Sequence, residues 1–178
     1  GLLGQLRERS FRDFPERIAA ATPGEEVGVT QAMSSEADTK FHVILIAPGK
    51  EDVKRGTLLI LNPEEEILQI TREWAKPFVD DRMVVAVLPR GGIPSKWTVK
   101  NPPNYVARSH ALIGSTVDTG RVREAASAAR RFAEIKNGEV AWRVVGRGQA
   151  GVIAAYAALF EPSIKEVVIV DPPASHRD

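Results

Sequence analysis

The fold of this chain is decided by residues 144–153, which read Val-Val-Gly-Arg-Gly-Gln-Ala-Gly-Val-Ile. Residues 140–145 form a short run that is mostly apolar, and such a run is typical of a strand buried on both faces. Residues 152–160 are rich in alanine and predict a helix, and residues 166–170 form a further apolar run. The order of strand, glycine-rich turn, helix and strand predicts a βαβ unit, which is right-handed in nearly all proteins.

Three earlier runs repeat this strand pattern. Residues 41–46, 56–61 and 83–88 are mainly apolar, and each is followed within three residues by proline or glycine. Runs that are apolar throughout suit strands in a parallel sheet that helices cover on both faces. We therefore expect the α/β class, with a mostly parallel sheet flanked by helices.

Two further helices are expected between these strands. Residues 64–78 predict one, and its acidic start (Glu64, Glu65 and Glu66) complements a helix dipole. A longer helix is expected to begin near Asp118 or Thr119, either of which could cap it, and to end at Asn137-Gly138 by a left-handed turn.

The first part of the chain has a different character. Residues 2–21 place apolar side chains among charged ones and predict one or two short amphipathic helices. Residues 22–39 read as loop, with a short strand around 27–29. The sequence thus divides into an N-terminal helical and loop segment, 1–39, and an α/β domain, 40–178.

Composition narrows the classes of partner. A formal net charge of +1 gives no electrostatic case for nucleic acid or an acidic membrane, and no apolar run reaches the roughly 20 residues of a membrane span. The absence of cysteine removes disulfides and thiolate metal sites. We expect a soluble protein without a metal or other cofactor. The chain begins at Gly1 without methionine, so a secreted or periplasmic protein whose leader was removed stays among the alternatives.

The glycine-rich turn has three interpretations. The first is a nucleophile elbow, a strained turn with the pattern small-x-nucleophile-x-small, which lifts the nucleophile above the sheet. Gly146, Ala150 and Gly151 supply the small positions, and Gly148 occupies the position of the nucleophile. This interpretation agrees with the place of the turn, since an elbow follows several strands.

The second interpretation is a dinucleotide-binding turn. Gly146, Gly148 and Gly151 satisfy the pattern G-x-G-x-x-G, and Asp171 lies where a ribose-binding acid belongs, about 20 residues further on. However, such a turn normally follows the first strand of its domain. In the third interpretation the glycines only let the helix and the strand pack closely.

The stretch from Val144 to Leu159 resembles the elbow and following helix of bacterial esterases of the α/β-hydrolase superfamily. The similarity is greatest to the acetyl-xylan-esterase and dienelactone-hydrolase-like relatives of prolyl oligopeptidase. The segments 111–115 and 120–125 resemble the start of a helix in the same group. The resemblance covers roughly residues 40–175.

This resemblance implies acyl transfer to a serine, with histidine as the base and an acid that orients it. It also implies that the backbone N–H of Gln149, directly after the nucleophile, helps to hold the oxyanion. The sequence departs from the pattern, because Gly148 has no side chain and cannot form an acyl-enzyme. Asn62-Pro63-Glu64 stands where a His-Gly type of segment is usual, and Pro63 has no N–H to donate.

Other residues could replace parts of a catalytic set. Asp171 ends a predicted strand, with Ser175 and His176 close behind it, although residues this near in one loop rarely converge as a triad. His110 beside Ser109 is more simply a surface or packing residue, and His42 within a strand is expected to face its exposed edge. Three scattered histidines without paired carboxylates do not predict a metal site.

We therefore expect an α/β-hydrolase-like domain of esterase lineage, incomplete at its C-terminus, with its chemistry lost or relocated. Its ligands would be a small ester or an acetylated carbohydrate, and a non-catalytic binding module is the alternative. The strand at 166–170 would leave a sheet edge open. A second copy of the chain or a further C-terminal segment is expected to cover that edge.

Overall fold

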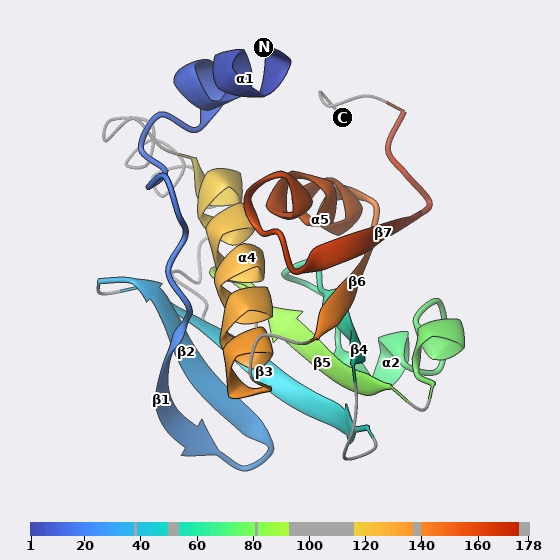
Figure 1. The fold of residues 1–178 in the computed structure, drawn as a ribbon. Coiled ribbons are helices and arrows are strands. Elements are labelled where there is room, and N and C mark those ends of the chain that lie inside the picture. Colours follow the sequence, from blue (N-terminus) through green and yellow to red (C-terminus); the bar gives the residue numbers. More distant parts are fainter. Residues whose placement is uncertain (38, 50–53, 81, 93–115, 137–139, 175–178) are drawn as a thin grey trace.

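The computed structural model describes residues 1–37, 39–49, 54–80, 82–92, 116–136 and 140–174. These residues form a seven-stranded mixed sheet with helices on its faces, in the strand order β1-β2-β3-β5-β4-β6-β7 (Figure 1). The α/β class is therefore confirmed. The strands are β1 (Thr22–Val27), β2 (Thr30–Glu36), β3 (Thr39–Pro48), β4 (Arg55–Ile60), β5 (Met83–Leu88), β6 (Ala141–Arg147) and β7 (Ile164–Val170).

The parallel core of the sheet consists of β5, β4, β6 and β7. Its strands are apolar on both faces because successive side chains enter two different cores. In β4, Leu58 and Ile60 face one core, whereas Leu59 and the following Leu61 face the other. All four are buried, which explains why the sequence there is continuously apolar.

Two long helices cover one face of this sheet. α4 (Val117–Ile135) and α5 (Gln149–Phe160) lie side by side in Figure 1 and share a core with β4 and β6. The opposite face is covered by α2 (Ile67–Ile70) and the 3₁₀ turn η1 (Lys76–Phe78). The parallel strands are thus covered by helical structure on both faces of the sheet.

The expected single helix over residues 64–78 is wrong. Only α2 and η1 are helical there, with turns between them. Glu65 does not begin a helix. Its carboxylate accepts hydrogen bonds from the backbone N–H of Asn62 (2.8 Å) and from Trp74 Nε1 (3.0 Å). Pro77 lies in η1, where its missing N–H costs nothing because first-turn N–H groups have no helical partner.

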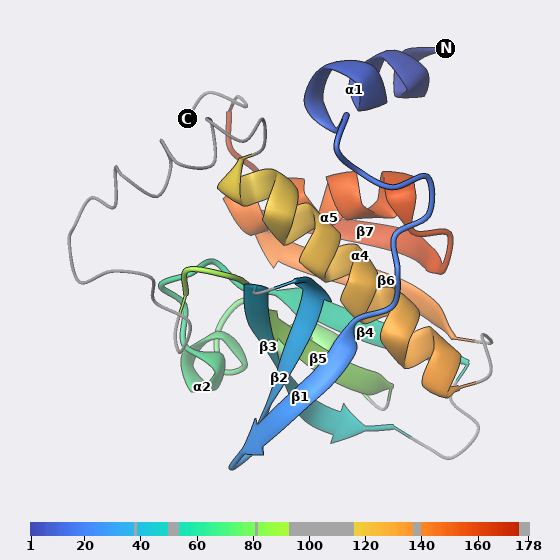
Figure 2. The same ribbon diagram turned by 90° about the vertical axis from the view of Figure 1, so that its left-hand side faces the viewer.

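The expected loop over residues 22–39 is also wrong, because β1 and β2 form an antiparallel hairpin that pairs with β3 (Figure 2). Every residue of β1 is exposed, so this strand shows no apolar pattern. The hairpin turns at Gly28, whose φ of +62° favours glycine.

The long helix α4 begins slightly earlier than predicted. Its N-cap is Thr116, whose hydroxyl accepts from the N–H of Thr119 while the Thr119 hydroxyl accepts from the N–H of Thr116. This reciprocal pair is a capping box, so Asp118 and Thr119 lie inside the helix. The predicted end at 137–138 lies outside the described residues.

The N-terminal segment begins with α1 (Leu2–Ser10) and then packs against α5. Phe11 contacts Tyr156 and Phe160 with ring centroids 5.5 and 4.8 Å apart, and Phe14 lies 5.1 Å from Phe160. Aromatic contacts of this kind stabilise by roughly 0.5–1.5 kcal/mol beyond area burial.

Among the described residues, β7 pairs with β6 alone and forms one edge of the sheet. Ile169 on this strand is 37% exposed. The expectation that a second copy or a further segment covers this edge stays a prediction.

Candidate functional site

The glycine-rich turn lies where the strand order reverses. From β4 the chain continues to β5 on one side, whereas β6 and β7 lie on the other side of β4. Ligands of open α/β sheets bind outside the carboxyl ends of the strands at such a switch point. The residues that follow β4 and β6 therefore occupy the favoured position for a site.

Packing requires two of the three glycines in the turn. A Cβ at Gly146 would lie 2.5 Å from backbone atoms of Ala150, and one at Gly151 would lie 2.3 Å from the Ile169 side chain. These contacts let α5 approach β6 and β7 closely. The small positions of the predicted elbow are thus small for steric reasons.

Gly148 differs from the other two glycines. Its φ of +56° and ψ of −124° form a strained conformation that residues with side chains rarely adopt. Within the described part of the chain, a Cβ built at Gly148 meets no atom within 4 Å. The predicted nucleophile position, Gly148, therefore has a backbone conformation that favours glycine and, among the described residues, open space above it.

The side chain of Asn62, which follows β4, spans this turn. Its Nδ2 donates to the carbonyl of Arg147 at 3.0 Å, and its Oδ1 accepts from the N–H of Ala150 at 3.1 Å. The N–H of Gly148 donates to the carbonyl of Val170 at 2.8 Å. The turn is thereby held from β4 and from β7. Sequence reasoning gave Asn62 no role, although a polar residue directly after a buried strand is a usable signal.

Asp171 directly follows β7, and its carboxylate accepts from Arg147 Nε at 2.9 Å. Both side chains are largely exposed. A nucleotide on this turn would compete with Arg147 for Asp171 and with Asn62 for the N–H of Ala150. These two contacts argue against the dinucleotide interpretation of Gly146, Gly148 and Gly151.

Of the other candidate residues, the structure describes His42 alone. His42 lies in β3 between β2 and β5, so the expectation that it faces an exposed edge is wrong. Burial lowers the pKa of His42, and the nearby charge of Lys40 lowers it further. Ser109, His110, Ser175 and His176 lie outside the described residues.

Two hollows meet at the start of α5. The smaller lies beside the turn and is lined by Asn62, Pro63, Pro89, Arg121, Gln149 and Ile153 among others. The larger is a groove between α4, α5 and the end of α1. Its lining combines apolar and hydroxyl groups, among them Phe11, Thr119, Val122, Gln149, Ile153 and Tyr156.

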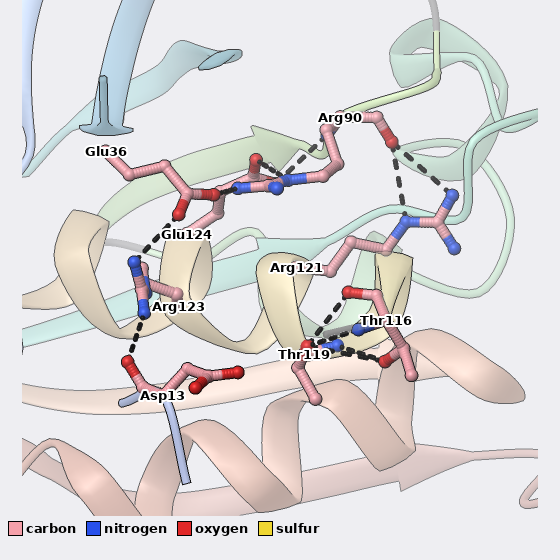
Figure 3. Close-up of polar contacts among 8 residues, drawn as sticks. All are labelled: Asp13, Glu36, Arg90, Thr116, Thr119, Arg121, Arg123 and Glu124. Carbon is pink, nitrogen blue, oxygen red and sulfur yellow. Dashed lines mark hydrogen bonds and ion pairs between the residues drawn. The ribbon is translucent and has the colours of Figure 1, made fainter. Parts of the chain in front are cut away.

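A buried cluster of charges lies on the other side of the α4 N-terminus (Figure 3). Arg90, in the segment after β5, donates from Nε to Glu124 Oε1 at 2.6 Å and from its backbone N–H to Oε2 at 3.0 Å. Its guanidinium also pairs with Glu36 of β2, which accepts from Arg123 Nη1 at 2.8 Å. We call Arg90, Glu124, Glu36 and Arg123 the α4 charge cluster.

The centre of this cluster is closed to solvent. Glu124 is fully buried, and burial raises its pKa to about 7 although Arg90 acts to lower it. Burial acts to lower the pKa of Arg90, but Glu124 and Glu36 outweigh that effect and the pKa is raised. A Cβ at Gly120 would lie 2.4 Å from the Arg90 guanidinium, so glycine at this position makes room for the ion pair. The cluster joins β2, the segment after β5 and α4.

In the described ranges no three His, Cys, Asp or Glu side chains are grouped to hold a metal ion. None of the helices in those ranges combines the length and apolarity that crossing a membrane requires.

Comparison with solved structures gives the fold a name. Acetyl xylan esterase 1 from Thermoanaerobacterium sp. JW/SL YS485 matches 97% of this chain with a TM-score of 0.59 at 16% identity. The acetyl xylan esterase from Paenibacillus sp. R4 matches 98% with a TM-score of 0.53 at 15% identity. A cold-adapted esterase from an Arctic intertidal metagenomic library matches 83% with a TM-score of 0.54 at 13% identity. The chain thus has an α/β-hydrolase fold that resembles those of esterases.

The match covers 57%, 59% and 63% of the three solved chains, so this sequence spans little more than half of their length. Neither a protein-family model nor a curated protein sequence matches the chain. At these identities the likeness describes the fold alone.

Proposed function

We propose that this chain is an α/β-hydrolase-fold domain of carboxylic-ester hydrolase lineage whose elbow has lost acyl-enzyme chemistry. The observation that carries the proposal is Gly148. It combines the strained backbone of an elbow with open space where a side chain would project. Plain packing explains Gly146 and Gly151, but it does not require glycine at position 148, where a Cβ meets no described atom within 4 Å.

Esterase chemistry through a serine needs a side-chain oxygen that attacks the carbonyl carbon and carries the acyl group. Gly148 has no such atom. The segment after β4 is also poorly suited to hold an oxyanion, because Pro63 has no N–H and the N–H of Asn62 already donates to Glu65. Gln149, the first residue of α5, remains as the backbone donor of the elbow. Loss of one oxyanion donor alone costs roughly 10²–10³ in kcat.

The proposed ligand class is a small ester or an acetylated carbohydrate, bound without turnover. The groove between α4 and α5 supports this class, because it begins at Gln149 and offers apolar and hydroxyl groups together. Ligand sites of this kind are mostly apolar, with a few placed polar groups. The chain would then act as a binding module on a hydrolase scaffold.

The test is hydrolysis of 4-nitrophenyl acetate by the natural chain, by Gly148→Ser and by Gly148→Ala. The alanine variant is the matched control, because it carries the same backbone strain without a nucleophile. We expect the natural chain and Gly148→Ala to release nitrophenolate no faster than buffer. In Gly148→Ser we expect release of nitrophenolate together with an acetyl group on the introduced serine.

Hydrolysis by the natural chain above the Gly148→Ala control would contradict the proposal. A folded Gly148→Ser variant that stays unacetylated would show that the elbow lacks more than its nucleophile. That result would favour a binding module with no usable catalytic remnant.

A further inference from the structure

Among the described residues, Asn62 is the side chain that hydrogen-bonds to the elbow from outside the βαβ unit that contains the turn. It is 85 residues from Arg147 and 88 from Ala150, yet it bonds to the backbone of both. A carboxamide carries a donor and an acceptor on one planar group, and here both are used. The two bonds lie on either side of Gly148 in the chain.

Asn62 is itself held in place. Its backbone N–H donates to Glu65 Oε2 at 2.8 Å, and Glu65 Oε1 accepts from Trp74 Nε1 at 3.0 Å. The preceding residue, Leu61, donates from its N–H to the carbonyl of Val87 in β5. The amide therefore extends from a fixed base, which is what a group that determines the geometry of a turn requires.

The elbow needs such support because its conformation is strained. With a side chain present, a sparsely populated region of φ and ψ has a free-energy cost, and a residue persists there only when its surroundings determine it. Glycine removes most of that cost at position 148, but glycine also lets the turn adopt many other conformations. A glycine elbow thus depends more on outside bonds than an elbow with a side chain does.

We propose that Asn62 is the positioning residue of this elbow: its amide holds the 146–151 turn in the conformation that presents residue 148. This inference rests on the proposed function, because it assigns Asn62 to the turn that is proposed to have lost its nucleophile. Asn62 acts through the backbone of Arg147 and Ala150 and does not itself touch the reacting atoms.

The first test uses the natural glycine chain and requires no activity. Amide hydrogen exchange of Ala150 is measured by NMR in the natural chain, in Asn62→Leu and in Asn62→Asp, with the β6 amide of Val144 as an internal reference. Leucine removes both bonds, whereas aspartate keeps the acceptor for Ala150 and loses the donor to Arg147. Gln69→Leu, which removes an exposed amide bonded to Glu73, is the control variant.

We expect Ala150 to exchange about fivefold to tenfold faster in Asn62→Leu, as loss of one hydrogen bond predicts. Exchange at Val144 should not change, and Asn62→Asp and Gln69→Leu should behave like the natural chain at Ala150. Unchanged exchange of Ala150 in Asn62→Leu would overturn the proposal. A rise at Val144 as well would also overturn it, because Asn62 would then stabilise the whole sheet and not the turn.

The second test adds the same Asn62 changes to Gly148→Ser and measures its acetylation by 4-nitrophenyl acetate. In that step the introduced oxygen attacks the carbonyl carbon, the bond to nitrophenolate breaks, and the hydroxyl proton passes to buffer base. We expect Asn62→Leu to lower the rate constant of acetylation but not the half-saturating concentration of the ester, with a smaller loss in Asn62→Asp. Equal rates with and without Asn62 would contradict a positioning role.

The two tests separate the two proposals. If Gly148→Ser is never acetylated, the proposed esterase lineage of the elbow fails. The exchange of Ala150 still tests the role of Asn62.

Discussion

The elbow and the α4 charge cluster both lie near the carboxyl ends of the parallel strands, but they are built in opposite ways. The elbow depends on its backbone and on small residues at 146, 148, 150 and 151, and within the described part of the chain space is open above Gly148. The cluster consists of long charged side chains around the fully buried Glu124, which bonds to Arg90 twice.

This difference distinguishes the elbow, a candidate ligand site, from the α4 charge cluster, which connects elements of the fold. The raised pKa of Glu124 draws attention to the cluster. However, pKa values are perturbed in structural ion networks as well as in active sites. Its charged side chains pair with one another, and Gly120 makes room for Arg90. The elbow combines enforced geometry with an accessible position. Here geometry is the better guide to the site.

The largest change in the free energy of unfolding is expected for Glu124→Ala, which tests whether the cluster is structural. It leaves the buried Arg90 guanidinium with Glu36 as its remaining carboxylate partner, and removing one member of a buried pair costs roughly 3–5 kcal/mol. Urea unfolding should show this loss. Glu134→Ala, at an exposed position of the same helix, should change the free energy of unfolding by less than about 0.5 kcal/mol. A small loss in Glu124→Ala would break the structural interpretation of the cluster.

The next effect is expected for Gly146→Ala. The added methyl would overlap backbone atoms of Ala150 at 2.5 Å, and a backbone cannot move aside cheaply. We expect a loss at the upper end of the roughly 1–3 kcal/mol that overpacking costs, measured by thermal or urea unfolding. Stability equal to the natural chain would show that α5 does not pack on β6 as described.

Gly148→Ala is expected to cost less, about 1–2 kcal/mol, because it adds strain without a steric clash. Gly28→Ala is the matched control, since Gly28 has a φ of +62° and is likewise without neighbours within 4 Å. Similar losses in the two variants would support strain as the cause. A much larger loss at Gly148 would mean that its open space is filled.

The smallest effect is expected for Arg147→Ala, which removes the exposed ion pair with Asp171. Surface pairs of this kind contribute roughly 0–1 kcal/mol. Urea unfolding should therefore be almost unchanged. A loss of the size expected for Gly148→Ala would indicate that Arg147 supports the elbow through its side chain.

Most of the parallel core could be predicted from the sequence because burial on both faces leaves a continuous apolar run, as in β4 and β5. The hairpin of β1 and β2 escaped prediction because β1 is exposed throughout and its partner strand is only partly buried. The expected helix at 64–78 failed because Glu65 bonds to Asn62 and Trp74, contacts that helical spacing does not reveal.

The candidate site was predictable in its local part. The pattern from Gly146 to Gly151 indicated the turn, and the structure adds that Gly148 alone among its glycines has open space. The contacts of Asn62 and of the α4 charge cluster could not be predicted, because they join residues far apart in the sequence. Arg90 and Glu124, for example, are 34 residues apart, and only the packing of α4 brings them together.

The central claim is that residue 148 lies at the apex of a preformed elbow, and a crystal structure of Gly148→Ser tests it most directly. The account predicts that the introduced serine keeps a positive φ near that of Gly148, that its hydroxyl projects into open space, and that Asn62 still bonds to Arg147 and Ala150. A serine that relaxes to negative φ, or a hydroxyl buried against α5, would contradict the claim.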